Sequence, residues 1–531
     1  MFAQLMTSRR FWPIFVCQFF SALNDNFIKT ALSLLVLYQL GTEQGPVLVT
    51  LAGATLIVPF FLFSGVGGEL ADRFDKARVA RWIKTAEVPI AILAAVGFYL
   101  SSIPMLFASL FGFGVMAALF GPIKYGILPE KLSTAELPAA NALVEGATFL
   151  AILLGTIAGG IAMTTVSGAV MLAPWMIAAL IAGFALLGLA SAALVPVTGP
   201  AEPTLKVHRN PLSSTALLLG ELKADRRLGN AGWITGWFWL AGVVALAMLP
   251  TLVRHAINGT EAVTTAGLVV FVVGIAFGSW AAARASHLRP NLAVVPVGAV
   301  LMGLFALYAA TLIAALPAAP ATAVTLGDIA QDPLVIQLGA ALFGLAAAGG
   351  LFIVPSFAAL QMWSAPERRA RTIAGVNILH AGLMTVASLA LAGGQAAGMA
   401  YAVPFLVIAV GSIATAVVVC RAWGRDGIRD LGRAVFNFFY RLEVEGLENL
   451  PKPGERAVIA PNHVSLLDGP LLHTVMPDHA AFAIWTGVAN WWWSKPFLKL
   501  INFFTMDPTN PMATRSLINV VKSGQTLVIF P

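Results

Sequence analysis

Apolar stretches long enough to cross a lipid bilayer recur along most of this chain and constrain its fold more than any other feature. They begin at Phe11 and end near Arg421, and 58% of all residues are hydrophobic while only 11% are charged. A bilayer core takes about 20 helical residues. The pattern therefore predicts an α-helical polytopic membrane protein. Twelve spans are expected, near residues 11–40, 46–70, 83–100, 103–128, 140–165, 172–195, 230–254, 263–284, 291–314, 334–360, 371–398 and 400–421.

Positive charge is distributed unevenly between the loops that join these spans. Every second loop is rich in Lys and Arg, whereas the opposite loops contain almost only Arg254. Because basic loops stay in the cytoplasm, this bias places both termini and the 197–229 linker there. Topology explains the net charge of +7, and nucleic acid is not expected as a partner. The basic residues are Arg73, Lys76, Arg78, Arg81, Lys206, Arg209, Lys223, Arg226, Arg227, Arg284, Arg289, Arg368, Arg369 and Arg371.

The spans fall into two sets of six, joined by a long polar linker. Two such halves are typical of a duplicated transporter fold. Cys17 and Cys420, the two cysteines, both lie in apolar segments, so neither a disulfide framework nor a metal site is expected. The expected domains are a first six-helix half at 1–197, a cytoplasmic linker at 198–229, a second six-helix half at 230–424 and an α/β domain at 425–531.

A charged loop between the second and third spans carries the first family resemblance. It reads GELADRFDKAR from Gly68 to Arg78 and resembles the loop signature of the major facilitator superfamily, with Asp75 where the family has glycine. The resemblance implies a twelve-helix major facilitator fold, in which this loop latches one conformation of a rocking bundle. The alternative is a loop that is basic only for topology, but a weaker repeat from Gly278 to Arg289 favours the resemblance. The motif residues are Gly68, Asp72, Arg73, Lys76 and Arg78.

Two further segments resemble the lysophospholipid transporter branch of that superfamily. They are Asn24-Asp25-Asn26-Phe27 and the run FGPIKYGILP from Phe120 to Pro129. This resemblance covers roughly residues 10 to 420. It implies transport of a lysophospholipid across the inner membrane of a bacterium.

Four charged residues inside the expected spans need a partner or a wet cavity, because a lone charge in lipid is costly. They are Asp25, Lys29, Lys124 and Glu145. In one interpretation, Asn24 and Asp25 hold a headgroup amine or a coupling cation while Lys124 meets a phosphate. In the other, a buried Asp–Lys pair locks the helices together. The sequence leaves both open.

Other polar and small residues in the spans are expected to serve packing. Asn377 and His380 are interpreted as helix–helix hydrogen-bonding residues rather than ligands. The glycine-rich stretches at 155–160 and 344–350 fit close helix contacts and do not require a phosphate-binding loop.

After Arg425 the composition becomes that of a soluble α/β domain. Short apolar runs at 457–460 and 526–530 are typical of buried strands. The segment NHVSLLD, from Asn462 to Asp468, follows the first run. In a regular helix, five steps of about 100° would place His463 and Asp468 roughly 140° apart, so His463 is expected on a loop before a helix. Ser465 is then the expected N-cap, with Asp468 as third helical residue of a capping box.

Asp468 at a helix N-terminus can do more than cap it. An ionised carboxylate there can fix the tautomer of His463 and stabilise its imidazolium, which is what a general base needs to take a proton from a hydroxyl. The alternative is that Asp468 only caps the helix, but capping leaves Asn462 and His463 without a role.

This His-X4-Asp pattern resembles the first block of the glycerolipid acyltransferase family, which includes 1-acylglycerol-3-phosphate acyltransferases. The resemblance covers about residues 440–531, and the final residues, VIFP, look like the start of a Phe-Pro-Glu-Gly block. The sequence stops before that Glu and Gly, and residues 503–510 lack the Arg of the family's second block, for which Arg515 is a distant substitute. The resemblance implies His463 and Asp468 as catalytic residues and substrate contacts from Asn462, Ser465, Phe530 and Pro531.

The two resemblances together imply one pathway. A lysophospholipid is flipped inward and re-acylated at the cytoplasmic face, with acyl carrier protein or acyl-CoA supplying the acyl group and no further cofactor or metal. The tryptophans and lysines from Trp491 to Lys499 suit contact with lipid headgroups, although a core helix with one wet edge is the alternative. Fused proteins of this kind often carry an acyl-carrier-protein synthetase downstream. Because the sequence ends inside the Phe-Pro-Glu-Gly block, the acyltransferase domain is expected to be incomplete and the chain to be the N-terminal part of such a fusion.

Two other functions stay open at this point. In the first alternative, the chain is a solute or drug exporter with an inactive acyltransferase-like tail. In the second alternative, it is a membrane-anchored acyltransferase without transport.

Overall fold

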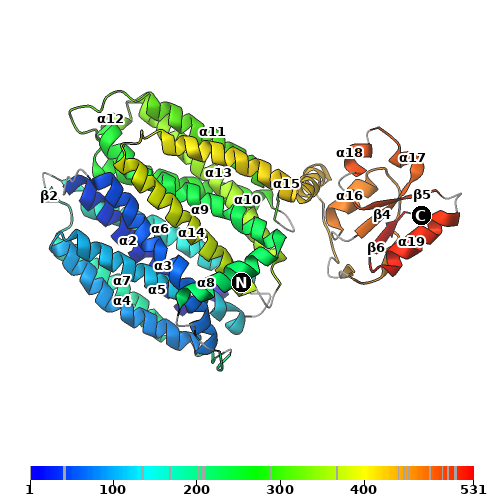
Figure 1. Ribbon diagram of the computed structural model, residues 1–531, viewed down its shortest axis with the longest axis horizontal. Coiled ribbons are helices and arrows are strands. Elements are labelled where there is room, and N and C mark those ends of the chain that lie inside the picture. The colour runs from blue at the N-terminus through cyan, green and yellow to red at the C-terminus, as the bar shows by residue number, and fades with distance from the viewer. Residues whose placement is uncertain are drawn as a thin grey trace. The chain divides into compact units, whose positions relative to one another are not determined.

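The computed structural model describes residues 2–39, 44–132, 137–166, 169–200, 202–205, 207, 210–286, 290–365, 369–440, 442–446, 449–451, 454–476, 480–492, 494–498, 501–507 and 511–530. The chain forms two compact units. Residues 1–284 and 295–422 make up the first unit, a bundle of long helices, and residues 285–294 and 423–531 make up the second, which contains a sheet (Figure 1).

Each of the twelve expected spans coincides with a long helix. Among the described helices, ten have the length and composition of a membrane span, and the other two, α2 and α4, carry charged residues well inside the helix. Short π-helical turns, η1 (Leu35–Gln39) and η2 (Val253–Ile257), follow α2 and α9. The twelve are α2 (Trp12–Leu34), α3 (Gly45–Arg73), α4 (Lys76–Tyr99), α5 (Ile103–Lys131), α6 (Leu137–Met163), α7 (Pro174–Ala193), α9 (Arg226–Leu252), α10 (Glu261–Ala285), α11 (Val294–Ala314), α13 (Pro333–Trp363), α14 (Arg369–Ala396) and α15 (Val403–Tyr440).

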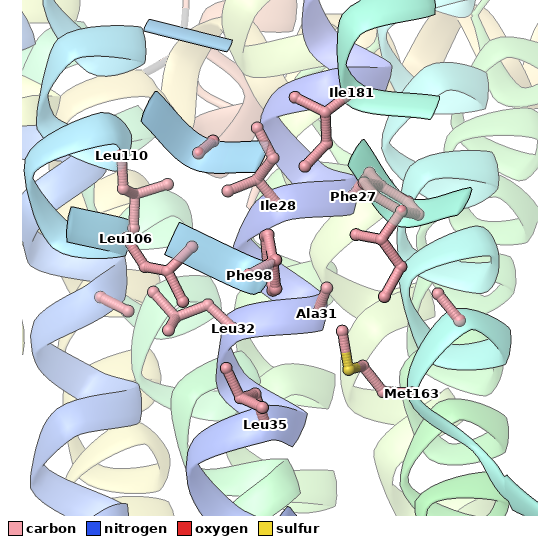
Figure 2. Packing of buried hydrophobic residues seen from close by; sticks show 14 of the residues in the cluster. Phe27, Ile28, Ala31, Leu32, Leu35, Phe98, Leu106, Leu110, Met163 and Ile181 are labelled. Carbon is pink, nitrogen blue, oxygen red and sulfur yellow. The ribbon is translucent and has the colours of Figure 1, made fainter. Parts of the chain in front are cut away.

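Small residues let the helices of the first half approach closely. A side chain at Gly155 would collide with the carbonyl of Leu23, and a Cβ at Gly159 would lie 2.7 Å from the carbonyl of Phe27, so α6 packs directly on α2. The glycine-rich stretch at 155–160 therefore serves packing, as expected. An apolar cluster surrounds this contact (Figure 2) and includes Phe27, Ile28, Ala31, Leu32, Leu35, Phe98, Leu106, Leu110, Met163 and Ile181.

The second half is held by similar means. A side chain at Gly350 would collide with the carbonyl of Ile275, so α13 packs directly on α10. His380 on α14 is buried, and its Nε2 lies 3.0 Å from Thr235 Oγ1 and 3.2 Å from the carbonyl of Gly232, both on α9. It makes the helix–helix hydrogen bond that the sequence predicted.

The linker contains a helix that the sequence did not predict, α8 (Pro211–Ala224). Thr215 Oγ1 donates to the carbonyl of Phe61 on α3 at 3.0 Å, and Glu221 forms an ion pair with Arg371 on α14. Helix α8 thus contacts both halves. Near the other ends of α3 and α14 the halves meet directly, where Thr50 Oγ1 donates to Gln395 Oε1 at 2.7 Å.

The second unit is built on a parallel sheet with the strand order β3-β6-β4-β5. The strands are β3 (Ala457–Ile459), β4 (Ala480–Trp485), β5 (Phe503–Met506) and β6 (Thr526–Ile529), and they alternate with α16 (Asp468–Val475), α17 (Thr486–Ala489), α18 (Ser494–Leu498) and α19 (Pro511–Lys522). The sequence predicted β3 and β6 but neither β4 nor β5. Alternate residues of the central strands face opposite sides of the sheet: Phe482 packs with Leu498 on one side, and Ala481 packs with Leu517 on the other.

Helix α15 continues past the boundary expected at residues 424 and 425, and its residues from Trp423 onward belong to the second unit. Charged side chains of this extension are buried there. Asp430 Oδ2 accepts the N–H of Leu292 at 2.9 Å, and Arg433 Nη2 donates to the carbonyl of Thr474 at 3.0 Å. Arg433 also pairs with Asp430 at 3.2 Å.

Candidate functional site

His463 and Asp468 lie in contact between the end of strand β3 and the start of helix α16. His463 lies on the loop after β3, as predicted, and Nδ1 of its ring is 2.9 Å from Oδ2 of Asp468. Asp468 is the first residue of α16. The His463 side chain remains 40% exposed, so its ring is accessible to a substrate.

Asp468 also organises the loop that carries His463. Its Oδ2 accepts the backbone N–H groups of Val464 and Ser465, each at 2.8 Å, while Ser465 Oγ accepts the N–H of Leu467 at 3.2 Å. These reciprocal bonds resemble a capping box. The predicted helix start was wrong, because Ser465 to Leu467 form a turn and the helix begins at Asp468 instead of placing it third.

Hydrogen bonds hold Asp468 in its charged form. The N–H of Ser465, the His463 side chain and the N–H of Val464 lower the pKa of the Asp468 carboxyl below its ordinary value. Asp468 is therefore an anion at neutral pH. An anion beside Nδ1 favours the tautomer with the proton on Nδ1, which leaves Nε2 as an acceptor. This geometry suits a general base with its orienting carboxylate.

Phe530 borders the same site from the neighbouring strand. Strands β3 and β6 pair in parallel, with Ile459 opposite Val528, so both end at one edge of the sheet. The rings of His463 and Phe530 meet there, with centroids 4.7 Å apart and planes at 41°.

The structure describes some of the other residues expected to contact substrate or lipid, and others lie outside the described residues. Asn462 is exposed, and its Oδ1 accepts the N–H of His463 at 3.1 Å. Pro531 lies outside the described residues. Trp491 and Trp492 are exposed on the turn between α17 and α18, whereas Trp493 and Lys499 also lie outside the described residues. Arg515 is exposed on α19.

In the first unit, the predicted transport residues lie on α2 and α5. Asn24 is 2% exposed, its Nδ2 donates to the carbonyl of Ile181 at 3.4 Å, and its Oδ1 has no partner among the described residues. Asp25 is half-buried on the same helix, and Lys124 is half-buried on α5.

The described residues contain no ion pair between Asp25 and Lys29. Lys29 Nζ instead donates to Asn26 Oδ1 at 3.1 Å. The side chain of Glu145 is outside those that the structure describes. Asp25 and Lys29 therefore make no direct contact, and both interpretations of Asp25 stay predictions.

A buried ion pair that the sequence analysis missed lies on α4. Lys84 is fully buried and pairs with Glu87. Its Nζ also donates to Ser21 Oγ on α2 at 2.5 Å and lies 4.3 Å from the centre of the Phe120 ring on α5. The available signal was the spacing of two opposite charges three residues apart inside an expected span.

The loop motif between α3 and α4 is organised by the residue that departs from the family pattern. Asp75 is the N-cap of α4: its Oδ1 accepts the N–H of Arg78 at 2.8 Å, and its Oδ2 accepts those of Thr198 and Gly199 at 2.7 Å. Although burial opposes it, these hydrogen bonds lower the pKa of the Asp75 carboxyl. Asp75 thereby ties the loop to the start of the linker.

The five motif residues do not form one cluster. Lys76 is buried and pairs with Glu130 on α5. Arg73 lies 5.2 Å from the centre of the Phe74 ring, while the other charged residues of the motif are exposed and Gly68 faces open space. Those exposed residues are Asp72 and Arg78.

A helical bundle with charged residues inside its spans, followed by a parallel α/β unit with a His–Asp pair, defines a membrane transporter that carries an acyltransferase-type domain. Residues 14–344 match the Major Facilitator Superfamily, and residues 441–531 match the family described as Acyltransferase. The chain belongs to the Major Facilitator Superfamily.

Relatives and solved structures agree with this assignment. The lysophospholipid transporter LplT of Cronobacter sakazakii is 31% identical over 383 residues, which cover 70% of this chain and 84% of that protein. The transporter of the same name from Salmonella newport is 32% identical over 388 residues, with 70% and 83% covered. The human organic anion transporter MFSD10 superposes with a TM-score of 0.56 at 17% identity, covering 77% of this chain and 99% of that one. The D-xylose-proton symporter gives 0.55 at 13% identity, with 77% and 97% covered. At such identities the structures show the fold alone.

Proposed function

We propose that this protein moves lysophospholipid inward across the inner membrane of a bacterium and re-acylates it at the cytoplasmic face. The observation that carries the proposal is the pairing of His463 with Asp468 in the same chain as a major facilitator bundle. The relatives that match the bundle are named lysophospholipid transporters. In this proposal the transporter delivers lysophospholipid to the acyltransferase domain, so the two parts of the chain act in sequence on the same lipid.

In the proposed reaction, Nε2 of His463 takes the proton from a free hydroxyl of the lysophospholipid. The hydroxyl oxygen attacks the carbonyl carbon of an acyl thioester, so that a C–O bond forms and the C–S bond breaks. The thiolate leaves and takes the proton from His463. Asp468 stabilises the imidazolium between the two proton transfers. Acyl carrier protein or acyl-CoA is the proposed donor.

For the transport step, we place the headgroup amine or a coupling cation at Asn24 and Asp25, and the phosphate at Lys124. The buried Oδ1 of Asn24, which has no partner among the described residues, supports a donor from a ligand at this position. A half-buried carboxylate next to it is costly in lipid without a counter-charge.

The test uses the natural protein, with any residues that follow Pro531, in sealed vesicles of known orientation. Fluorescent lysophospholipid is supplied on one side and a labelled acyl thioester on the other. Flipping together with transfer supports the proposal. Transfer without flipping indicates a membrane-anchored acyltransferase, and flipping without transfer indicates a transporter with an inactive tail. Neither activity would favour an exporter of other solutes.

A further inference from the structure

An arginine lies on the side of the helix bundle where the loops carry almost no other Lys or Arg. Helix α9 begins beside the linker and ends in the π-helical turn η2, so Arg254 lies at the end of the bundle opposite the linker. Arg254 is half-buried, and it forms no ion pair with any carboxylate that the structure describes. A guanidinium that is partly removed from water without a counter-charge is costly, which is typical of a residue that binds a ligand.

Two neighbours hold the guanidinium of Arg254 in place. Its Nη1 donates to Asn258 Oδ1 at 3.2 Å, and its central carbon lies 5.0 Å from the centre of the Tyr38 ring. An aromatic ring attracts a cation that lies over its face. A guanidinium has five N–H donors along its edge, and Asn258 uses one of them. The edge that is left matches two oxygens of one phosphate group.

The backbone around this arginine has an irregular conformation. Arg254 lies in the π-helical turn η2, and Tyr38 lies in the corresponding turn η1 at the end of α2. Such turns are rare and are found frequently at functional sites. Asn258 has a φ of 55°, in the left-handed region that residues other than glycine seldom adopt, and its Nδ2 donates to the carbonyl of Pro320 at 2.9 Å. Strained residues of this kind cluster at ligand-binding sites.

The site lies where the two halves of the bundle meet. Tyr38 belongs to the first half, whereas Arg254 and Thr264 belong to the second. Tyr38 Oη lies 2.5 Å from Thr264 Oγ1, so the ring that covers the guanidinium is itself held by the second half. At the same end, a side chain at Gly160 on α6 would collide with Thr265 on α10. Substrate sites of duplicated transporters lie between the repeats, so Arg254 is placed where a substrate would enter.

We propose that Arg254 binds the phosphate group of a lysophospholipid at the membrane side opposite the linker, before the lipid passes between the halves. Tyr38 and Asn258 are positioning residues that hold the guanidinium for this contact. The inference rests on the proposed function, because the phosphodiester is the anionic group that lysophospholipids share. It adds an entry site to the phosphate contact placed at Lys124.

The first test measures anion binding and does not require transport. Sealed vesicles with the linker side inward carry the natural protein and are treated with a membrane-impermeant phenylglyoxal, which modifies arginine. Mass spectrometry follows the modification of Arg254. Glycerophosphoglycerol, a phosphodiester without acyl chains, should slow this modification about fivefold at about four times its Kd. Potassium chloride of the same ionic strength should leave the modification rate unchanged.

Four results of this test would overturn the proposal. Arg254 that is not modified even without the diester is not reachable from this side. No protection by the diester means that no phosphodiester binds there. Equal protection by potassium chloride indicates only charge screening. Stronger protection by inorganic phosphate than by the diester would assign the site to free phosphate instead of a lipid headgroup.

The second test asks whether the site serves entry of the lipid. Initial rates of flipping from the side opposite the linker are measured against the concentration of lysophosphatidylglycerol. Arg254→Gln should raise KM about tenfold and leave kcat nearly unchanged, which is the scale of one lost hydrogen bond to a charged group. His255→Gln, at an exposed position on the same turn, is the matched control and should keep both constants.

Variants of Tyr38 test its positioning role separately. Tyr38→Leu removes the ring and should raise KM in the same way, whereas Tyr38→Phe keeps the ring and should restore the KM of the natural protein. An unchanged KM in Arg254→Gln, or a lower kcat with the same KM, contradicts the entry site. Absence of flipping by the unmodified protein would instead contradict the proposed function, and the protection experiment would still decide whether Arg254 binds a phosphodiester.

Discussion

Nδ1 of His463 lies 2.9 Å from Oδ2 of Asp468, and that same oxygen accepts the backbone N–H groups of Val464 and Ser465. One carboxylate oxygen thus holds both the imidazole ring and the loop that carries it. Because the loop joins β3 to α16, the position of the ring depends on the start of that helix.

Replacing His463 by Ala should remove acyl transfer and leave lysophospholipid flipping intact. Loss of a positioned base lowers the rate by about 10²–10⁴, whereas loss of a helix cap costs only about 1 kcal/mol of stability. Transfer rate and melting temperature, measured on the same samples, separate the two roles. Asp468→Asn is the companion variant, which keeps the shape of the side chain but not its charge. Unchanged transfer in His463→Ala would remove the mechanism.

The loop around His463 should stay ordered as the pH falls to the ordinary carboxyl pKa. It should loosen only below that pH, where Asp468 becomes protonated. Its folded-state pKa is depressed, so the stabilisation is present above the ordinary carboxyl pKa and is lost as pH falls through the lowered value. Hydrogen exchange of a peptide covering residues 462–468, corrected for the intrinsic pH effect, reports this change. Asp468→Asn should exchange fast at every pH. Protection lost already above the ordinary carboxyl pKa would contradict the assignment.

Asp25→Asn should abolish lysophospholipid flipping while the protein level in the membrane is unchanged. The carboxylate is half-buried on a helix inside the bundle and forms no ion pair with Lys29. An ionisable group at such a place is expected to serve a ligand. Asp328→Asn, at an exposed position on the short helix α12 (Leu326–Ile329), is the matched control. Full transport by Asp25→Asn would favour a purely structural carboxylate.

The buried pair on α4 should show strong coupling between its two partners. Removing one partner of a buried ion pair typically costs about 3–5 kcal/mol, because the other charge stays buried alone. Lys84→Met and Glu87→Gln should therefore each lower the thermal stability of the purified protein. The double variant Lys84→Met/Glu87→Gln, which combines the two single changes, should recover most of the loss, since no charge is left uncompensated. Additive losses in the double variant would show that the pair is not coupled.

The linker helix α8 should face the cytoplasm. A cysteine introduced by Lys223→Cys, at an exposed position, should resist a membrane-impermeant maleimide in intact cells and react after the cells are opened. Ala319→Cys, in the exposed loop between α11 and α13, should react in intact cells and serves as the control. Labelling of Lys223→Cys from outside would reverse the topology and with it the cytoplasmic location of the second unit.

The positions of the spans followed from local composition, because crossing a bilayer needs a minimum length of apolar residues that can be read from a short window. The approach of His463 to Asp468 was also local. Five residues apart, the two side chains can meet only if the first lies on a loop before the helix, and the structure has that arrangement. The helix start was misplaced because a turn with capping-type hydrogen bonds precedes α16.

Local sequence did not reveal the strands β4 and β5, because short apolar runs do not distinguish a strand from a buried helix. The ring contact between His463 and Phe530 depends on the parallel pairing of β3 with β6, which joins residues far apart in the chain. Three helices must pack before Lys84 can reach both Ser21 and Phe120. Sequence by itself determined which segments cross the membrane and which two residues form the candidate base. Tertiary structure decided what surrounds them, because contacts between distant residues depend on how whole helices and strands pack.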